Sequence, residues 1–292
     1  MKHFPFLAIV LMIISCQPKE TPLSEEYIKA INEWKENRDV RLRAPTGYVN
    51  LVGLYWLEEG VNTFGSDSSN SLVFPPNAPA FMGTFNLKDS VVTFKSSDSL
   101  QVVVDSNIAK NLVIDKPNSG PTMEYQNFKW FVIERAGNIG IRLRDVELPS
   151  TKKPLNIPYF EVNKEWIITA KFKPFEAPKK YKIDNILGHS FQEDIKGELI
   201  FEKDGATYSL LPLMDENGIF LMFADETSGL ETYGAGRYLV ADVPDQNNEV
   251  ILDFNKAYNP PCAFTDFATC PLPPQENILD LSITAGEQYK MH

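Results

Sequence analysis

Residues 196–213 read KGELIFEKDGATYSLLPL, and this stretch decides the fold class. Two runs of strand-forming residues, KGELIFE and ATYSLLPL, stand on either side of Lys203-Asp204-Gly205. An Asp-Gly turn between two such runs is a strong signal for a β-hairpin. The stretch therefore predicts two antiparallel strands joined by a tight turn.

Strand-like runs continue from Tyr48 onward, and Gly, Asp, Asn, Ser and Pro separate them. A second hairpin is predicted at Ala136-Gly137, between FKWFVIER and NIGIRLRD. Strands do not alternate with long helices, which argues against an α/β protein. We expect a mainly β fold, an antiparallel sandwich or barrel.

One short helix is predicted before the strands. Ser24 can cap its first turn, and two glutamates follow at the positive end of the helix dipole. Apolar residues then recur with helical spacing as far as about Arg38, at Leu23, Tyr27, Ile31 and Trp34.

The length of 292 residues suits one large all-β domain or two modest ones. Prolines are concentrated between Pro149 and Pro158, where two sheets or two subdomains can divide. We expect a single mainly β domain over residues 23–292. The net charge of −11, without a basic block, argues against nucleic-acid binding and against adhesion to anionic lipid.

The first residues, MKHFPFLAIVLMIISC, predict a bacterial lipoprotein signal peptide over residues 1–15. Lys2 begins the segment, an apolar run too short to span a bilayer follows, and Cys16 ends a lipobox-like sequence. We expect lipid on Cys16 to anchor the protein to a bacterial membrane, on the periplasmic or outer-membrane face. Residues 16–22 then form a short polar tether.

Two regions carry arginines that can bind an anion. Arg142 and Arg144 share one face of a strand, and a solvated strand face is the simpler interpretation. The loop 225–237 holds three glycines in eight residues, and such loops can bring amides close to an anion. Arg237 can hold a carboxylate or phosphate through two hydrogen bonds. The alternative is a wide β-connection that satisfies its own turns.

A third region, LDFNKAYNPPCAFTDFATCPLPPQEN at 252–277, combines prolines, cysteines, aspartates and asparagines. In an oxidising envelope Cys262 and Cys270 predict a disulfide. Alternatively Cys262 is a thiolate nucleophile beside Arg237, although no histidine is placed to activate it. Two cysteines without a second ligand pair make a zinc site a weak hypothesis.

Histidine is scarce after the signal peptide, so a Ser-His-Asp hydrolase would need His189, with Ser228 as nucleophile. A carboxylate mechanism or a Ca²⁺ site remains open for Asp225, Asp253 and Glu276. No residues are assigned to a metal site, and the cofactor stays unknown.

The chain resembles the domain of unknown function family 1684 of bacteria and archaea. TSGLETYGAGRYL, the stretch 252–279 and TAGEQY carry the resemblance, and NLVGLYWLEEGVNTFGS and GIRLRDVELP are similar to that family's N-terminal segments. The resemblance spans roughly Trp34 to Tyr289. It brings no established activity. It also implies cytoplasmic relatives, which weakens the case for an obligatory disulfide. The family's usual polar positions correspond to Asp225, Thr227, Gly229, Thr232, Tyr233, Gly234, Arg237, Asp253, Asn255, Tyr258, Asn259, Cys262, Cys270, Pro271, Glu276 and Asn277.

Three functions follow as hypotheses. In the first, the loops 225–237 and 253–277 build a pocket for a small polar ligand such as a glycan fragment, with contacts from Arg237, Asn255, Tyr258, Asn259, Tyr233 and Thr232. In the second, the protein is a hydrolase in which Asp225 or Asp253 is the base and loop amides hold the anion. In the third, the Pro/Cys segment only locks the β edges.

Overall fold

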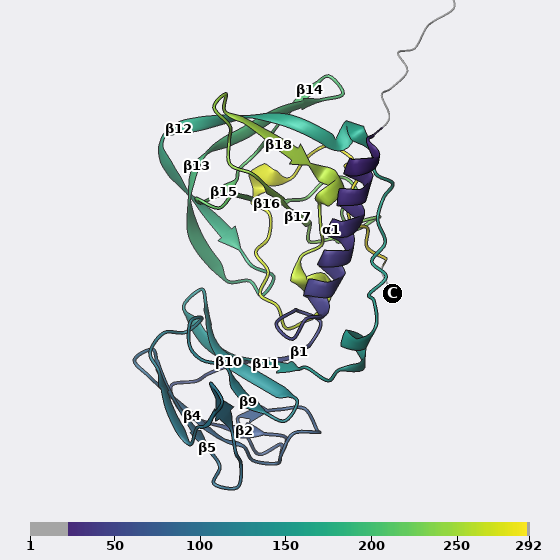
Figure 1. Cartoon of the computed structure of the whole chain (residues 1–292). Helices are drawn as coiled ribbons and strands as arrows, with labels where there is room; N and C mark the ends of the chain where they lie inside the picture. The colour runs from purple at the N-terminus through teal and green to yellow at the C-terminus, as the bar shows by residue number, and fades with distance from the viewer. Residues whose placement is uncertain (1–22, 291–292) are drawn as a thin grey trace, which may run out of the picture.

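The computed structural model describes residues 23–290. The predicted signal peptide, the predicted lipidation site at Cys16 and the predicted tether lie outside the described residues. Two bodies of strands follow each other along the chain (Figure 1). We call residues 51–145 the N-terminal β unit and residues 155–290 the C-terminal β unit.

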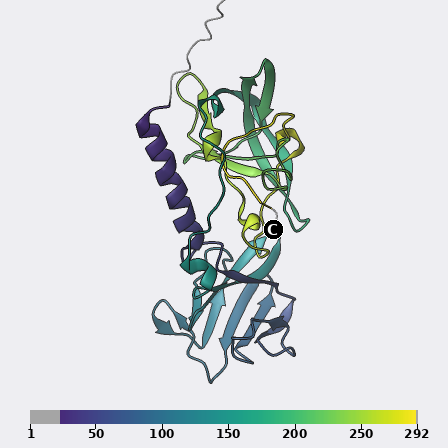
Figure 2. The same ribbon diagram turned by 90° about the vertical axis from the view of Figure 1, so that its right-hand side faces the viewer.

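The helix α1, Glu25–Arg43, precedes both units. The Ser24 side chain accepts a hydrogen bond from the backbone N–H of Tyr27 at 3.1 Å, which confirms the predicted cap. The helix runs five residues past the predicted end and stops before Pro45, because the residue that precedes a proline avoids helical geometry. Figure 2 shows α1 lying along the C-terminal β unit with its last turn near the N-terminal β unit.

Two sheets build the N-terminal β unit. One has the order β1-β11-β10-β9-β6-β7 and the other the order β3-β2-β4-β5-β8. The bounds of the first sheet's strands are β1 Leu51–Trp56, β6 Val103–Val104, β7 Asn107–Ile108, β9 Met123–Tyr125, β10 Phe128–Arg135 and β11 Asn138–Asp145. Those of the second are β2 Gly60–Gly65, β3 Leu72–Val73, β4 Gly83–Lys88, β5 Val91–Ser96 and β8 Asn111–Ile114.

Aromatic side chains fill the space between these two sheets. Phe85 of β4 packs against Phe94 of β5, with ring centroids 5.5 Å apart. Phe94 also meets Trp130 of the other sheet, with ring centroids 6.4 Å apart. The predicted turn at Ala136-Gly137 is confirmed, because both residues adopt positive φ between β10 and β11.

The C-terminal β unit has a sheet of order β14-β13-β12-β18 and a second of order β15-β16-β17. Its strands are β12 Ile167–Asp184, β13 Ser190–Lys203, β14 Ala206–Leu210, β15 Leu213–Met214, β16 Ile219–Phe223, β17 Arg237–Ala241 and β18 Glu249–Asp253. The predicted hairpin at 196–213 is present, with Asp204 and Gly205 both at positive φ between β13 and β14. Short 3-10 helices complete the chain at η1 Pro149–Lys152, η2 Lys164–Trp166, η3 Phe254–Lys256, η4 Pro261–Ala263 and η5 Gln275–Asn277.

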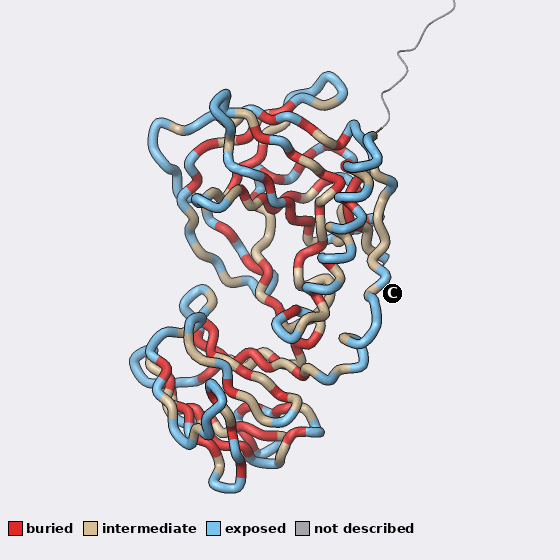
Figure 3. Tube along the Cα trace, in the orientation of Figure 1, coloured by how far each residue is buried: buried red, intermediate tan, exposed pale blue. Residues whose placement is uncertain are grey.

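The hydrophobic core is divided between the two units. One buried cluster runs from Leu57 to Leu143, and a second runs from Trp166 to Ala285 (Figure 3). The prediction of a mainly β, antiparallel protein with one N-terminal helix is confirmed; β2 and β3 form a parallel exception. The Pro149–Pro158 segment connects the two units. No helix within residues 23–290 has both the length and the apolar character to cross a membrane.

Candidate functional site

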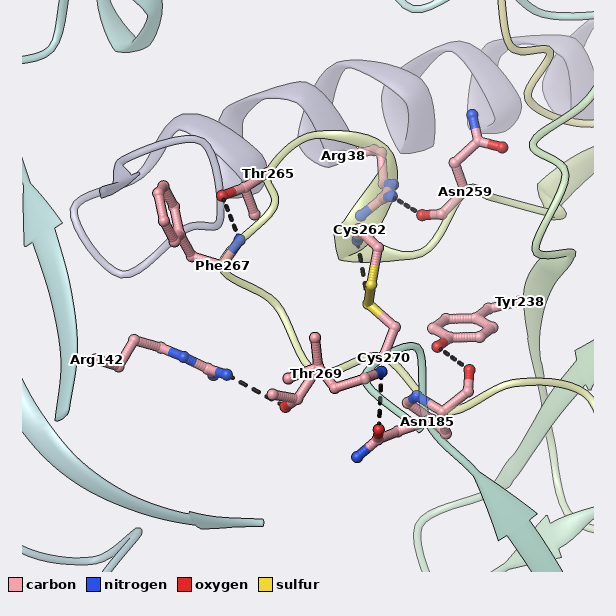
Figure 4. Close-up of a disulfide and its surroundings, with 12 residues drawn as sticks. Arg38, Arg142, Asn185, Tyr238, Asn259, Cys262, Thr265, Phe267, Thr269 and Cys270 are labelled. Carbon is pink, nitrogen blue, oxygen red and sulfur yellow. Dashed lines mark hydrogen bonds between the residues drawn. A yellow bond between two sulfur atoms is a disulfide. The ribbon is translucent and has the colours of Figure 1, made fainter. Parts of the chain in front are cut away.

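The two cysteines of the Pro/Cys segment form a disulfide, Cys262–Cys270, with their Cα atoms 6.2 Å apart. The backbone N–H of Cys262 also donates to Sγ of Cys270 at 3.1 Å (Figure 4). Both sulfurs are therefore held in a covalent bond, and in this state neither is a thiolate nucleophile.

The Arg237 side chain is fully buried beneath the glycine-containing loop. Its Nη2 donates to Oδ2 of Asp225 at 2.6 Å, and both terminal nitrogens donate to carbonyl oxygens of the segment 283–285. Burial lowers the pKa of Arg237, and the nearby Asp225 opposes this shift. These contacts occupy both terminal nitrogens, which we expected to hold a ligand, and leave Nε without a partner among residues 23–290. Arg237 therefore bonds to the protein itself.

The predicted residues Asp253 and Asn255 bind the N-terminal helix and a neighbouring loop. The Tyr27 hydroxyl donates to Oδ1 of Asp253 at 2.9 Å, and burial and this carboxylate raise the pKa of Tyr27. The Asn255 amide donates to the carbonyl oxygen of Asn163 and accepts from its N–H, both at 2.9 Å. Asp253 therefore bonds to α1, and Asn255 bonds to the segment that precedes β12.

Asn259 belongs to a buried network that also fastens α1. Its N–H donates to Oε2 of Glu287 at 2.8 Å, and its carbonyl oxygen accepts from Nη2 of Arg38 at 2.7 Å. The Asn259 side chain donates to the carbonyl oxygen of Gln288 at 3.0 Å. Asn259 thus makes local structural contacts as well.

The remaining predicted loop residues also have local partners. Thr232 is buried, and its hydroxyl lies 2.8 Å from that of Thr227, which donates to Asp225. The Tyr233 ring packs edge-on against Tyr289, with centroids 5.0 Å apart. Within residues 23–290 no group of three His, Cys, Asp or Glu side chains is placed to hold a metal ion.

Ser228 and His189, the pair that a Ser-His-Asp hydrolase would need, form no hydrogen bond with each other within residues 23–290. The Ser228 hydroxyl oxygen accepts a hydrogen bond from the N–H of Asp225 at 3.1 Å, within the loop. His189 lies at the tip of the β12–β13 hairpin, and its ring packs edge-on against Trp56 of the N-terminal β unit at 5.9 Å. The two residues therefore belong to different regions of the structure.

A cavity of about 420 Å³ lies where the two units meet, and the Pro/Cys segment forms one of its walls. Of the predicted ligand contacts, only Tyr258 lines it within the described chain. We call this space the interunit cavity. Its lining residues are Arg38, Tyr48, Arg135, Arg142, Phe220, Tyr238, Tyr258, Pro261, Ala268, Thr269, Cys270 and Pro271.

Arg142 reaches the cavity from β11 of the N-terminal β unit. Its side chain crosses to the other unit, where Nη2 donates to the Thr269 hydroxyl at 3.2 Å (Figure 4). Only 6% of the residue is exposed. The expectation of a solvated strand face is thus wrong for Arg142, because the segment 268–271 covers it.

The charge of Arg142 is not balanced by an acidic side chain. No Asp or Glu among residues 23–290 forms an ion pair with Arg142, and none lines the cavity. The Nε atom of Arg142 is buried and has no hydrogen-bond partner among residues 23–290. Burial, with a smaller contribution from nearby Arg135, lowers the pKa of Arg142 to about 10, so the guanidinium stays charged at neutral pH.

Sequence reasoning missed most of this site because the cavity joins distant segments. Arg135 and Arg142 come from one hairpin, Arg38 and Tyr48 flank the end of α1, and the rest belongs to the C-terminal β unit. One signal was available: β11 is flanked by β1 and β10, and an arginine within such a central, apolar strand needs a covering partner.

Comparisons with known proteins give one family match and one similar solved structure. No curated protein matches the sequence. An uncharacterised protein of Haloarcula marismortui, solved in solution by NMR, is 28% identical with a TM-score of 0.40, and the match covers 48% of this chain and 80% of that one. A model described as "Protein of unknown function (DUF1684)" matches residues 155–288, which nearly coincide with the C-terminal β unit. The segments 50–66 and 140–149, expected to resemble the same family, lie outside that match. Over residues 155–288 the chain is similar to the DUF1684 family.

Proposed function

We propose that this protein binds a small organic anion in the interunit cavity. The observation that carries the proposal is Arg142, a nearly buried cation with no acidic partner in the described chain. Buried charges in proteins are almost always paired, because the loss of hydration is costly. A carboxylate or phosphate group in the cavity would supply the missing negative charge.

The surroundings of Arg142 favour an anion over a neutral or cationic ligand. Arg135 and Arg38 also line the cavity, and of the three arginines only Arg38 has a carboxylate partner among residues 23–290, namely Glu287. The three arginines make the cavity locally positive, whereas the chain as a whole has a net charge of −11. A cationic pocket in an acidic protein concentrates anions from solution.

The hydrolase hypothesis gains no support from the geometry. Asp225 is paired with Arg237, Asp253 is bonded to Tyr27, and neither lines the interunit cavity. The structural hypothesis describes the loops 225–237 and 253–259 well, since their polar groups bond within the loops or to neighbouring parts of the chain. The two ideas are compatible: those loops build the framework, and the cavity holds the ligand.

Thermal unfolding of the full chain, with and without benzoate, tests the proposal. Benzoate at about 100 times its dissociation constant should stabilise the protein by about 2.7 kcal/mol, a rise of several degrees in melting temperature. Arg142→Gln should remove this rise. Because the substitution also removes an unbalanced buried charge, the melting temperature without ligand should stay the same or increase.

The control is Lys95→Gln, which removes one exposed positive charge from β5. It should leave the benzoate effect unchanged. A large loss of stability in Arg142→Gln would mean that Arg142 is a structural residue. An equal benzoate effect in both variants would place the anion elsewhere.

We also propose that lipid on Cys16 holds this binding domain at a bacterial envelope membrane, on the basis of the residues 1–16 alone. Cells fed a labelled fatty acid should incorporate label into the protein. The variant Cys16→Ala should not be labelled and should leave the membrane fraction. Label in that variant would contradict the proposed anchor.

A further inference from the structure

We infer that the ligand of the interunit cavity is an aromatic anion, whose acidic group meets Arg142 and whose ring meets a wall of aromatic side chains. This inference rests on the proposed function and adds the chemical class of the ligand. It is carried by the different chemistry of the two units where they face each other.

The C-terminal β unit contributes three connected rings to the cavity. Tyr238 of β17 packs edge-on against Phe220 of β16 at 4.8 Å and against Tyr258 at 5.8 Å. The Tyr238 hydroxyl donates to the carbonyl oxygen of Pro271 at 2.8 Å, which fixes the ring in place. A fixed aromatic wall of this kind favours a flat ring through edge-to-face or offset contacts.

The N-terminal β unit contributes charge instead. Arg135 and Arg142 come from the β10–β11 hairpin, and their guanidinium groups are planar donors that match the oxygens of a carboxylate or phosphate. Figure 4 shows Arg142 and Tyr238 on opposite sides of the segment that contains Thr269 and Cys270. A ligand that lies across this segment would therefore need an acidic group and a ring at separate positions.

The size of the cavity agrees with a ligand of two parts. A volume of about 420 Å³ is comparable to fourteen waters at about 30 Å³ each. Acetate or inorganic phosphate would fill only a small part of it, and would leave the apolar wall in contact with solvent. An aromatic acid would cover the wall and gain the free energy of apolar burial.

Residues from two parts of the chain, before and within 155–288, would each recognise a different part of the ligand. The aromatic wall lies within residues 155–288, which match the family, whereas Arg38, Tyr48, Arg135 and Arg142 lie before them. The anionic group is therefore recognised by residues outside the matched domain. We infer that binding requires both units.

Calorimetric titration of the full chain with a matched series separates the contributions of charge and ring. The series is acetate, phenylacetate, cyclohexylacetate and the neutral 2-phenylethanol, with phenyl phosphate to represent the other acidic group. We expect phenylacetate or phenyl phosphate to bind at least tenfold more tightly than acetate and more tightly than cyclohexylacetate. The alcohol should bind at least tenfold more weakly than phenylacetate.

Two variants locate the two contacts. Phe220→Leu keeps an apolar side chain but removes a ring from the wall, and it should reduce the ratio of phenylacetate to acetate affinity. Arg142→Gln should weaken every acid in the series. Lys95→Gln should leave all affinities unchanged.

The outcomes distinguish this inference from the proposed function. Equal affinities for acetate and phenylacetate, or for phenylacetate and cyclohexylacetate, would overturn the aromatic class while the anion site stands. Equal affinities for phenylacetate and the alcohol, or no binding by any acid, would overturn both. A Phe220→Leu variant with an unchanged affinity ratio would also overturn the aromatic wall.

Discussion

Arg38 and Glu287 are 249 residues apart in the chain and form a buried ion pair, with 2.9 Å between Nε and Oε1. The Glu287 carboxylate also accepts from the Tyr159 hydroxyl and from the N–H of Asn259. The helix that begins the described chain is thereby bonded to the segment that ends it. The N-terminal β unit lies in sequence between these two partners.

Loss of this pair should destabilise the protein strongly. Glu287→Gln leaves the Arg38 guanidinium buried without its counter-charge, and breaking a buried pair in this way costs about 3–5 kcal/mol. Urea unfolding of the variant measures the change in free energy. The control Glu33→Gln removes an exposed pair with Lys29 and should change stability by less than about 1 kcal/mol. Equal effects in the two variants would contradict the structural role of the buried pair.

Asn277 should tolerate no change in its hydrogen-bonding groups. Its fully buried amide donates to the carbonyl oxygens of Leu211 and Met222 and accepts from the N–H of Leu211 at 2.6 Å. Asn277→Asp keeps the shape but removes the donors, so a loss of at least about 1–3 kcal/mol is expected in urea unfolding. The same substitution at exposed Asn217 is the control. A similarly small effect at both positions would contradict a stabilising role for the Asn277 amide donors.

Reduction of Cys262–Cys270 should affect both stability and ligand binding. The bridge closes a short loop, and its loss should lower the free energy of unfolding by about 2–3 kcal/mol in the chain-entropy model. Thr269, Cys270 and Pro271 line the interunit cavity, so the benzoate-induced rise in melting temperature should also decrease. The comparison uses intact protein, reduced protein and Cys262→Ser/Cys270→Ser. An undiminished benzoate effect after reduction would show that the bridge does not shape the cavity.

Alkaline pH should destabilise the N-terminal β unit through Tyr55. Burial raises the pKa of Tyr55 to about 12, from an ordinary value of 10.0. Between these values the folded state keeps a proton that the unfolded state releases, so stability is lost as pH rises from about 10 towards 12. Tyr55→Phe removes the titrating group, and its stability should fall less steeply in urea unfolding over that range. Identical slopes for the two proteins would exclude Tyr55 as a cause.

The two units should unfold together. α1 precedes the N-terminal β unit but is bonded to the C-terminal β unit through Tyr27 and Arg38, so neither unit is delimited by a continuous stretch of chain. Scanning calorimetry should give one transition with equal calorimetric and van't Hoff enthalpies. Two separate transitions would contradict the prediction of one domain over residues 23–292.

Local sequence chemistry predicted the elements of this fold well. Ser24, the Ala136-Gly137 turn and the Asp204-Gly205 turn each act through neighbours a few residues away, so their effect is visible in sequence. The end of α1 was less clear, because Leu42 is buried by tertiary contacts that the helical pattern alone does not reveal.

The candidate site was only partly predictable, because polarity alone does not distinguish a ligand contact from a buried structural bond. Arg237 and Arg142 both lie in strands, yet one faces Asp225 at 2.6 Å and the other has only the Thr269 hydroxyl. The difference depends on which segments cover each arginine. For Arg142 that information arises from packing against Thr269, which lies 127 positions away.

The Arg38–Glu287 pair also has a consequence for synthesis on the ribosome. The N-terminal β unit emerges soon after α1, but α1 must wait for a partner made 249 residues later. At about 5–20 residues per second this interval is on the order of ten seconds to a minute. During that time the apolar stripe of α1 is exposed to chaperones and proteases, and the nascent chain is most vulnerable just before its last residues are added.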